Sequence, residues 1–335
     1  MANANLFCAY SRNFPPDPAA EFLLTTEGVR FSYGDLMRES ARMASFLVSL
    51  GVTPGARVTV ICDKSPAVVF WYLACLRAGL VFHPLNPAYT AAEIDFFISD
   101  ASPEVCIYDA GLEPNLTPLL ARHRVPYRYP LDAGTASLVH KSGTHPLEFE
   151  TRERLPDDTA ALLYSSGTTG KPKGILLSHA NLTRNAANLT AAWGFSRDDV
   201  LWHALPIFHV HGLFVALGCV LMSGSRVLFS PRFAVDETLD SLPRATVMMG
   251  VPTYYTRLLA SPRLNPERCA NVRLFTCGSA PLLEETWEAF NDRTGHAIVE
   301  RYGMTETSII ASNPLHGVRK AGSVGVPLPG TEVRV

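Results

Sequence analysis

The sequence lacks several features that mark specialised classes of protein. Its 29 basic and 31 acidic residues leave no surplus of positive charge for binding nucleic acid or an anionic membrane. It has no C-x-x-C pair, and its seven cysteines are scattered, mostly in apolar runs where buried free thiols are usual. We therefore expect a reducing, cytoplasmic environment, no zinc site and no nucleic-acid partner.

Long uninterrupted hydrophobic runs and an export signal are also missing. The apolar run 67–82 is interrupted by Arg77, and the run 205–222 contains Pro206, His209 and His211. Both fall short of the about 20 apolar residues that a membrane-spanning helix needs. The first residues have neither the basic nor the apolar region of a signal peptide. We expect no membrane span.

What is present is the composition of a globular α/β protein. Hydrophobic residues make up 47% and charged residues 18% of the 335 positions, which suffices for a sizeable core. Apolar runs typical of buried strands alternate with helical patterns along most of the chain. This alternation predicts a mostly parallel sheet covered by helices, and the length favours two lobes.

A Gly-rich stretch that follows the apolar run 160–163 is the most distinctive feature. It reads Tyr164-Ser-Ser-Gly-Thr-Thr-Gly-Lys-Pro-Lys-Gly174. Glycines let the backbone approach a ligand closely, and hydroxyls and lysines bind phosphate oxygens. The spacing is not that of a Walker A motif, because only two residues separate Gly167 from Gly170 and Pro172 follows the lysine. A polar surface loop is the alternative interpretation.

Two further motifs follow predicted strands. Gly278-Ser-Ala-Pro281 lies between a strand at 272–275 and a helix at 283–294, a position where open α/β sheets bind ligands. Glu300-Arg-Tyr-Gly-Met-Thr-Glu306 follows a strand at 297–300 and offers groups that stack on a base, bond a phosphate and hold a metal. An ordinary strand–helix turn and a helix start are the respective alternatives.

Two histidines and an arginine lie in apolar surroundings. His209 and His211 share the segment 205–213, and two histidines at this spacing are usually structural. Arg273 lies inside the apolar run that leads to Cys277. It either faces solvent or meets a buried anion, because an unpaired buried charge is costly.

Together these motifs resemble the signature of adenylate-forming enzymes, the acyl-CoA synthetase superfamily. Further stretches look like those of malonyl-CoA synthetases: 249–264, 278–283, 301–307 and 312–314. The resemblance spans essentially the whole chain. It implies an α/β fold, the large N-terminal domain of these enzymes, with two helix-covered, mostly parallel sheets and the start of a distorted β-barrel. The implied domains are a first lobe at 1–155, a second lobe with nucleotide loop and acid pocket at 156–315, and the barrel start at 316–335.

The resemblance implies a nucleotide site for ATP. Its residues are Ser165, Ser166, Gly167, Thr168, Thr169, Gly170, Lys171, Lys173, Gly278, Ser279, Ala280, Pro281, Glu300, Arg301, Tyr302, Gly303, Met304 and Thr305. The loop embraces the phosphates, and the turn at 278–281 and the pair at 302–303 flank the adenine. Thr305 contacts the α-phosphate, and Glu306 and Thr168 ligate Mg²⁺, a metal that prefers oxygen ligands.

The resemblance also implies an acid site. The implied catalytic residues are His209, Thr305 and Glu306. His209 lines the entrance to the acid pocket, and Ser279 and Met304 contact the acid. Arg273 grips the distal carboxylate of malonate or methylmalonate, which suits a guanidinium fork. The implied reaction joins ATP and the diacid into an acyl-adenylate, and coenzyme A sulfur then displaces AMP. We expect these small molecules as partners and a monomer or weak homodimer.

The sequence departs from the family pattern beyond the stretch 322–330. Family members continue through the rest of the barrel and a mobile C-terminal domain with a catalytic lysine, and neither occurs before Val335. We therefore expect weak ATP binding without efficient turnover. Two alternatives stay open: a ligase for another short-chain or aryl acid, with Arg273 merely structural, and a non-catalytic nucleotide- or acyl-binding fragment.

Overall fold

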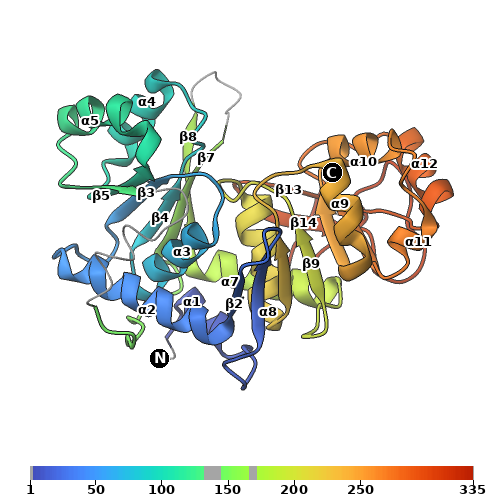
Figure 1. The fold of residues 1–335 in the computed structure, drawn as a ribbon, viewed down its shortest axis with the longest axis horizontal. Helices are drawn as coiled ribbons and strands as arrows, with labels where there is room; N and C mark the ends of the chain where they lie inside the picture. The colour runs from blue at the N-terminus through green and yellow to red at the C-terminus, as the bar shows by residue number, and fades with distance from the viewer. Residues whose placement is uncertain (1–2, 132–144, 166–171, 335) are drawn as a thin grey trace. The chain divides into compact units, whose positions relative to one another are not determined.

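The computed structural model describes residues 3–131, 145–165 and 172–334 (Figure 1). The chain forms two compact units, each built on one mostly parallel sheet with helices, which confirms the predicted fold class. Unit 1 comprises Met1–Arg12 and Tyr33–Thr183, and unit 2 comprises Asn13–Ser32 and Arg184–Val335. The described residues form no closed barrel.

Unit 1 contains a six-stranded sheet in the order β6-β5-β3-β4-β7-β8. All neighbours are parallel except the last pair, which is an antiparallel hairpin. The strands are β3 (Arg57–Ile61), β4 (Val81–Pro84), β5 (Val105–Asp109), β6 (Tyr127–Leu131), β7 (Thr159–Ser165) and β8 (Lys173–Ser178).

The helices of unit 1 begin and end where local signals predict. Pro66 opens α3, Gly79 ends it with a φ of 70°, and Thr90 and Glu93 form a complete capping box at the start of α4. The bounds are α1 (Leu6–Ser11), α2 (Tyr33–Ser49), α3 (Pro66–Ala78), α4 (Ala91–Ala101), η1 (Ala110–Leu112) and α5 (Glu113–Arg122).

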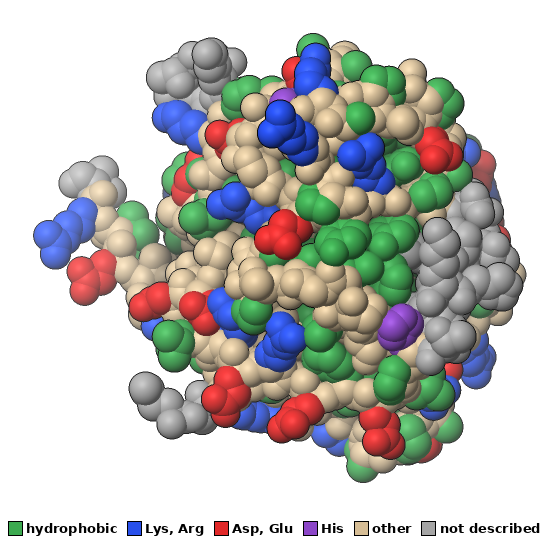
Figure 2. Space-filling model, turned by 90° about the vertical axis from the view of Figure 1, so that its left-hand side faces the viewer, with side chains coloured by type: hydrophobic (Ala, Val, Ile, Leu, Met, Phe, Trp, Pro, Cys, Tyr) green, Lys and Arg blue, Asp and Glu red, His purple; other side chains and the backbone are tan. Residues whose placement is uncertain are grey.

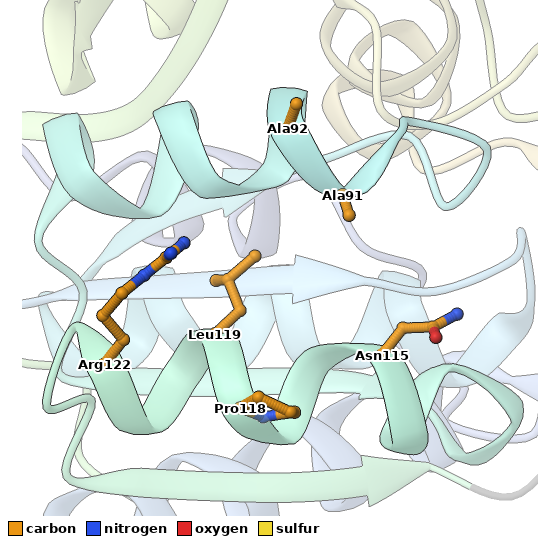
Figure 3. Close-up of a pocket in the computed structure, with 6 residues that line it drawn as sticks. All are labelled: Ala91, Ala92, Asn115, Pro118, Leu119 and Arg122. Atoms are coloured by element: carbon orange, nitrogen blue, oxygen red, sulfur yellow. The ribbon is translucent and has the colours of Figure 1, made fainter.

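A pocket of about 490 Å³ lies between α4 and α5, which run side by side (Figure 3). Leu119 and Arg122 point from α5 toward α4. The remaining lining residues are Ala91, Ala92, Asn115 and Pro118. None of these belongs to the site predicted from the sequence.

Unit 2 contains a nine-stranded sheet in the order β15-β14-β13-β12-β11-β9-β10-β1-β2. The interior pairs are parallel, and β2, β14 and β15 add antiparallel edges. The strands are β1 (Glu21–Thr25), β2 (Arg30–Ser32), β9 (Val200–His203), β10 (Arg226–Phe229), β11 (Val247–Gly250), β12 (Leu274–Cys277), β13 (Val299–Met304), β14 (Ser308–Ser312) and β15 (Val326–Pro327).

Helices connect the parallel strands of unit 2. A π-helical segment, η2 (His211–Ala216), leads directly into α8, at a place where the sequence predicts one continuous helix over 212–222. The others are α7 (His179–Ala192), α8 (Leu217–Ser223), α9 (Val235–Ser241), η3 (Leu242–Arg244), α10 (Pro252–Leu259), α11 (Pro266–Cys269) and α12 (Glu284–Thr294).

The boundary between the two compact units lies within α7, between Thr183 and Arg184. The boundary between the two lobes predicted from the sequence lies between residues 155 and 156. The physical reason for the difference is that β7 and β8 complete the first sheet by pairing with β4. The Gly-rich stretch between these two strands therefore belongs to unit 1.

Side-chain character agrees with a globular protein. The seven cysteines are free thiols, six of them buried, as their apolar surroundings predict. Acidic and basic side chains are interspersed over the face shown in Figure 2. None of the helices in the described ranges has the length and apolar character required to cross a bilayer.

Candidate active site

The turn after β12 carries the first group of predicted site residues. Gly278 is buried, and Ser279, Ala280 and Pro281 are exposed before α12 begins. Ser279 has a φ of 68°, a left-handed conformation that is uncommon for a residue with a side chain. Such strain clusters at functional sites. The turn therefore presents its side chains at the carboxyl end of the sheet, where open α/β folds bind ligands.

The second group lies on β13 and the turn that follows it. The sequence predicts that the strand ends at Glu300, but β13 continues to Met304 and forms a hairpin with β14. Gly303 permits this pairing, because a Cβ there would lie 2.2 Å from the carbonyl oxygen of Ser308. Tyr302 and Met304 are 44% and 45% exposed. Both side chains are therefore accessible to a ligand.

Glu300 has a different environment from its neighbours. Its Oε1 accepts a hydrogen bond of 3.0 Å from the backbone N–H of Gly322. Burial raises the pKa of the Glu300 carboxyl. These contacts show that Glu300 holds the segment around Gly322 against β13.

Arg301 carries a buried positive charge next to the turn after β12. It is 5% exposed, and burial lowers the pKa of its guanidinium to about 10. Its Nε and Nη2 have no hydrogen-bond partner among the described residues. A Cβ on Gly278 would lie 2.5 Å from both Cζ and Nε of Arg301. The glycine is therefore required for the guanidinium to lie against the turn.

The two histidines of the segment 205–213 have different surroundings. His209 is exposed, and its ring lies 4.6 Å from that of Phe208, centroid to centroid. His211 is 6% exposed, and its Nδ1 lies 3.2 Å from the Oγ of Ser279. Burial and the nearby charge of Arg301 hold the pKa of His211 well below its usual range. His211 is therefore neutral and in contact with the turn.

Arg273 lies at the opposite, amino end of the same strands. It precedes β12, and its Nε and Nη2 donate to Oδ1 and Oδ2 of Asp199 at 2.8 and 2.7 Å. Nη1 and Nη2 also donate to the carbonyl oxygens of Trp193 and Gly194 at 2.9 and 3.0 Å. The structure does not bring Arg273 to the turn residues. Its saturated guanidinium favours the structural alternative over a grip on the substrate.

The Gly-rich loop is described only at its two ends. Ser165 ends β7 and pairs with Lys173, the first residue of β8. Ser166, Gly167, Thr168, Thr169, Gly170 and Lys171 lie outside the described residues. The hairpin confirms the two strands predicted on either side of the loop. The assignment of the loop to phosphate stays a prediction.

Glu306 is the one predicted metal ligand that lies within the described residues. It lies exposed in the turn between β13 and β14, beside half-buried Thr305. An accessible carboxylate with solvent around it fits Mg²⁺, which keeps several waters and takes few protein ligands. In the described part of the chain, no three His, Cys, Asp or Glu side chains gather to form a protein-only metal centre.

The predicted residues that the structure describes on β12, β13 and their turns lie at the carboxyl ends of parallel strands in an open α/β sheet, the usual place for ligands in such folds. A model of the family "AMP-binding enzyme" matches residues 9–335. The chain belongs to this family, and its two sheets match the N-terminal domain of adenylate-forming enzymes.

Three related proteins illustrate the range of the family. A mitochondrial malonate–CoA ligase, ACSF3 of Mus musculus, is 35% identical over 296 residues, which cover 83% of this chain and 50% of that enzyme. A feruloyl-CoA synthase of Amycolatopsis sp is 32% identical over 314 residues, 92% of this chain and 61% of that enzyme. The crystal structure of ATP-bound MatB from Rhodopseudomonas palustris is 45% identical with a TM-score of 0.94, and covers 98% of this chain and 65% of that one. The chain thus spans about half to two thirds of these relatives.

The sequence predicts Arg301 only as part of a nucleotide motif, and of the two histidines it favours His209 rather than His211 as a site residue. The signal for His211 was its position two residues after His209 in an apolar segment. Nothing in the local sequence distinguishes which histidine is buried. The distinction comes from the contact with Ser279, 68 residues away in the chain.

Proposed function

We propose that this chain carries the nucleotide and acid sites of an ATP-dependent acid:CoA ligase that acts on a small dicarboxylic acid, malonate or methylmalonate. The observation that carries the proposal is the buried Arg301, whose Nε and Nη2 are unpaired among the described residues. A buried cation without a counter-charge is costly. A carboxylate matches the guanidinium by two parallel hydrogen bonds, so the second carboxylate of a diacid supplies the missing partner.

The reaction proposed for the whole enzyme has two steps. One carboxylate of the acid attacks the α-phosphate of ATP to give an acyl-adenylate and pyrophosphate, and the sulfur of coenzyme A then displaces AMP. Thr305 and Glu306 stand at the end of β13 to orient the phosphate and hold Mg²⁺. When bound, Mg²⁺ neutralises phosphate charge. Arg301 orients the acid so that its other carboxylate is the one that reacts.

Family membership alone does not choose the acid, because the relatives include a feruloyl-CoA synthase as well as malonate–CoA ligases. Arg301 favours the diacid. An aryl or simple fatty acid has no second carboxylate and would leave the guanidinium unpaired. Sites built for a polar group reject analogues that lack it for this reason. Arg301 thus replaces Arg273 as the proposed specificity residue.

Titration calorimetry with sodium malonate, acetate and ferulate, in the presence of a non-hydrolysable ATP analogue, tests the proposal. We expect malonate to bind more tightly than acetate or ferulate. The Arg301→Gln variant should lose about thirtyfold in malonate affinity, the effect of removing about 2 kcal/mol from a buried charge pair. Its acetate affinity should change little.

Arg293→Gln is the matched control, because Arg293 is an exposed arginine on α12. It should leave all three affinities unchanged. Equal binding of malonate and acetate by the unmodified chain would contradict the diacid assignment, and tighter binding of ferulate would favour the aryl-acid alternative.

We also propose a cytoplasmic protein that is a monomer or weak homodimer. The free cysteine thiols support a reducing compartment. Light scattering across a concentration series would detect a stable oligomer, which would contradict the second part.

A further inference from the structure

His211 begins η2, and its position is fixed by close backbone packing. A Cβ on the next residue, Gly212, would lie 2.0 Å from the carbonyl oxygen of Pro206. The Nε2 of His203 lies 2.9 Å from the carbonyl oxygen of Gly212, which anchors the same turn from the sheet side. Single π-helical turns occur frequently at functional sites. The backbone around His211 is therefore tightly packed, which fixes the position of its imidazole.

The contacts of His211 indicate its tautomer. A neutral imidazole carries one N–H donor and one bare acceptor nitrogen. When Nδ1 accepts the hydroxyl hydrogen of Ser279, Nε2 bears the hydrogen. In that state Nε2–H has no acceptor in the described part of the chain. The opposite tautomer would leave a bare Nε2 without a donor among the described residues, although Arg301 brings unpaired N–H groups to the same turn. We assign the first tautomer.

Unpaired donors of two side chains thus lie in one buried corner. Arg301 packs against Gly278, and the next residue, Ser279, contacts His211. Both side chains are more than nine-tenths buried: Arg301 is 5% and His211 6% exposed. Buried polar groups are normally hydrogen-bonded, so unpaired donors at one place require an explanation. An anion bound between the two side chains would supply acceptor oxygens for these donors.

We infer that His211 is a specificity-determining residue, whose Nε2–H donates to the same carboxylate that pairs with Arg301, while Ser279 fixes its tautomer. This inference rests on the proposed function and adds to it. Arg301 and His211 together bind the non-reacting carboxylate of a dicarboxylic acid. Arg301 contributes its positive charge, and His211 contributes a hydrogen bond from a neutral ring. His209, exposed on the same segment, has no part in this recognition.

Two amide substitutions separate the two ring nitrogens. In the His211→Gln variant the side-chain amide can occupy the position of Nε2 and keep a donor there. In His211→Asn the amide reaches only the position of Nδ1, so the donor to the ligand is lost. We expect the Asn variant to lose about tenfold in malonate affinity, because hydrogen bonds to charged groups have about this effect. The Gln variant should stay within about threefold.

The measurement is calorimetric titration of the full chain with sodium malonate and sodium acetate, beside an ATP analogue titrated alone. The acetate and nucleotide affinities should stay constant in both variants. If His211→Asn weakens malonate, acetate and nucleotide alike, the role is structural and the inference is wrong. If the unmodified chain and the His211→Asn variant prefer malonate over acetate to the same degree, this inference fails and the proposed function stands. If the unmodified chain shows no preference, the proposed function fails with it.

Nitrogen-15 spectra of the unmodified chain provide a test that needs no folded variant. Malonate should shift the Nε2 resonance of His211 and leave Nδ1 in its hydrogen-bonded position, and acetate should shift neither. An Nε2 resonance that is the same with and without saturating malonate would overturn the inference.

Discussion

The two ends of the sheet in unit 2 each hold an arginine, and the two differ in what surrounds them. At the amino end, Arg273 is 33% exposed and makes two bonds to Asp199 and two to backbone carbonyls. At the carboxyl end, Arg301 is 5% exposed and has two unpaired nitrogens in the described structure. Arg301 is thus more deeply buried than Arg273, yet more of its nitrogens lack a hydrogen-bond partner among the described residues.

The two arginines therefore differ in how far their hydrogen bonds are satisfied, and not only in burial. Asp199 also accepts bonds from the hydroxyl of Thr246 and the backbone N–H of Ser196, at 2.7 and 2.9 Å. The amino end is thus a closed network that joins the starts of β9, β11 and β12. At the carboxyl end two nitrogens of Arg301 have no partner among the described residues, and under the proposed function a carboxylate supplies it.

Arg273→Met should produce the largest effect on stability. The substitution leaves the carboxylate of Asp199, 4% exposed, without its cation. Because Arg273 is one third exposed, the loss should be smaller than for a fully buried ion pair, about 2 kcal/mol. Urea unfolding followed by tryptophan fluorescence should show this loss, and the ratio of malonate to acetate affinity should not change. A stable variant that has lost its preference for malonate would return Arg273 to the acid site.

Arg301→Met should act in the opposite direction. Methionine fills much of the volume of the arginine stem and removes a buried charge that the described residues leave partly unpaired. We expect the free energy of unfolding to rise by about 1 kcal/mol or more in the absence of ligand, because replacing poorly compensated buried charges often stabilises. Added malonate should stabilise the unmodified chain and not the variant. A variant much less stable than the unmodified chain would show that Arg301 is structural.

The sequence predicts the regular elements well because they depend on local patterns. The strand predicted at 226–229 coincides with β10, and the capping box of α4 forms as its residues indicate. Strand β12 begins at Leu274, two residues later than predicted. The shift arises because Arg273 is drawn to Asp199, 74 residues earlier in the chain. No local pattern contains that information.

The candidate site is predicted only in part for the same reason. The turn at 278–281 follows a strand as predicted, the segment 300–306 begins within β13, and the structure adds that β12 and β13 are adjacent. Which charged side chain is left without partners depends on distant contacts: the close approach of Arg301 to Gly278, and the bond between His211 and Ser279. The apolar run around Arg273 therefore makes it the predicted acid-binding residue, and no local pattern singles out Arg301 for that role.

Acid should weaken the two ends of the sheet in different pH ranges. His211 is buried in its neutral form beside Arg301, His203 and His209, so its folded pKa lies below the unfolded value of about 6.5. The unfolded chain then binds the extra proton, and the stability that His211 contributes is complete above that pH and lost as the pH falls below it.

Asp199 behaves differently. Burial raises its pKa, but hydrogen bonds from Arg273, Thr246 and Ser196 outweigh burial and lower it. Its contribution is lost only as the pH falls below about 3.9.

The His211→Gln variant isolates the first of these ranges. Between pH 6.5 and 5.5, the unmodified chain should lose about 1 kcal/mol more unfolding free energy than the variant, the amount that one histidine with a strongly lowered folded pKa supplies. Urea titrations at several pH values give the two slopes, and the buried His83 and His179 contribute equally to both proteins and cancel. Parallel slopes would mean that His211 takes up its proton in the folded chain over the same pH range as in the unfolded chain. In that case the imidazole would contribute a second positive charge beside Arg301 at the acid end of that range, and recognition of the carboxylate there would rest on two cations instead of a cation and a neutral donor.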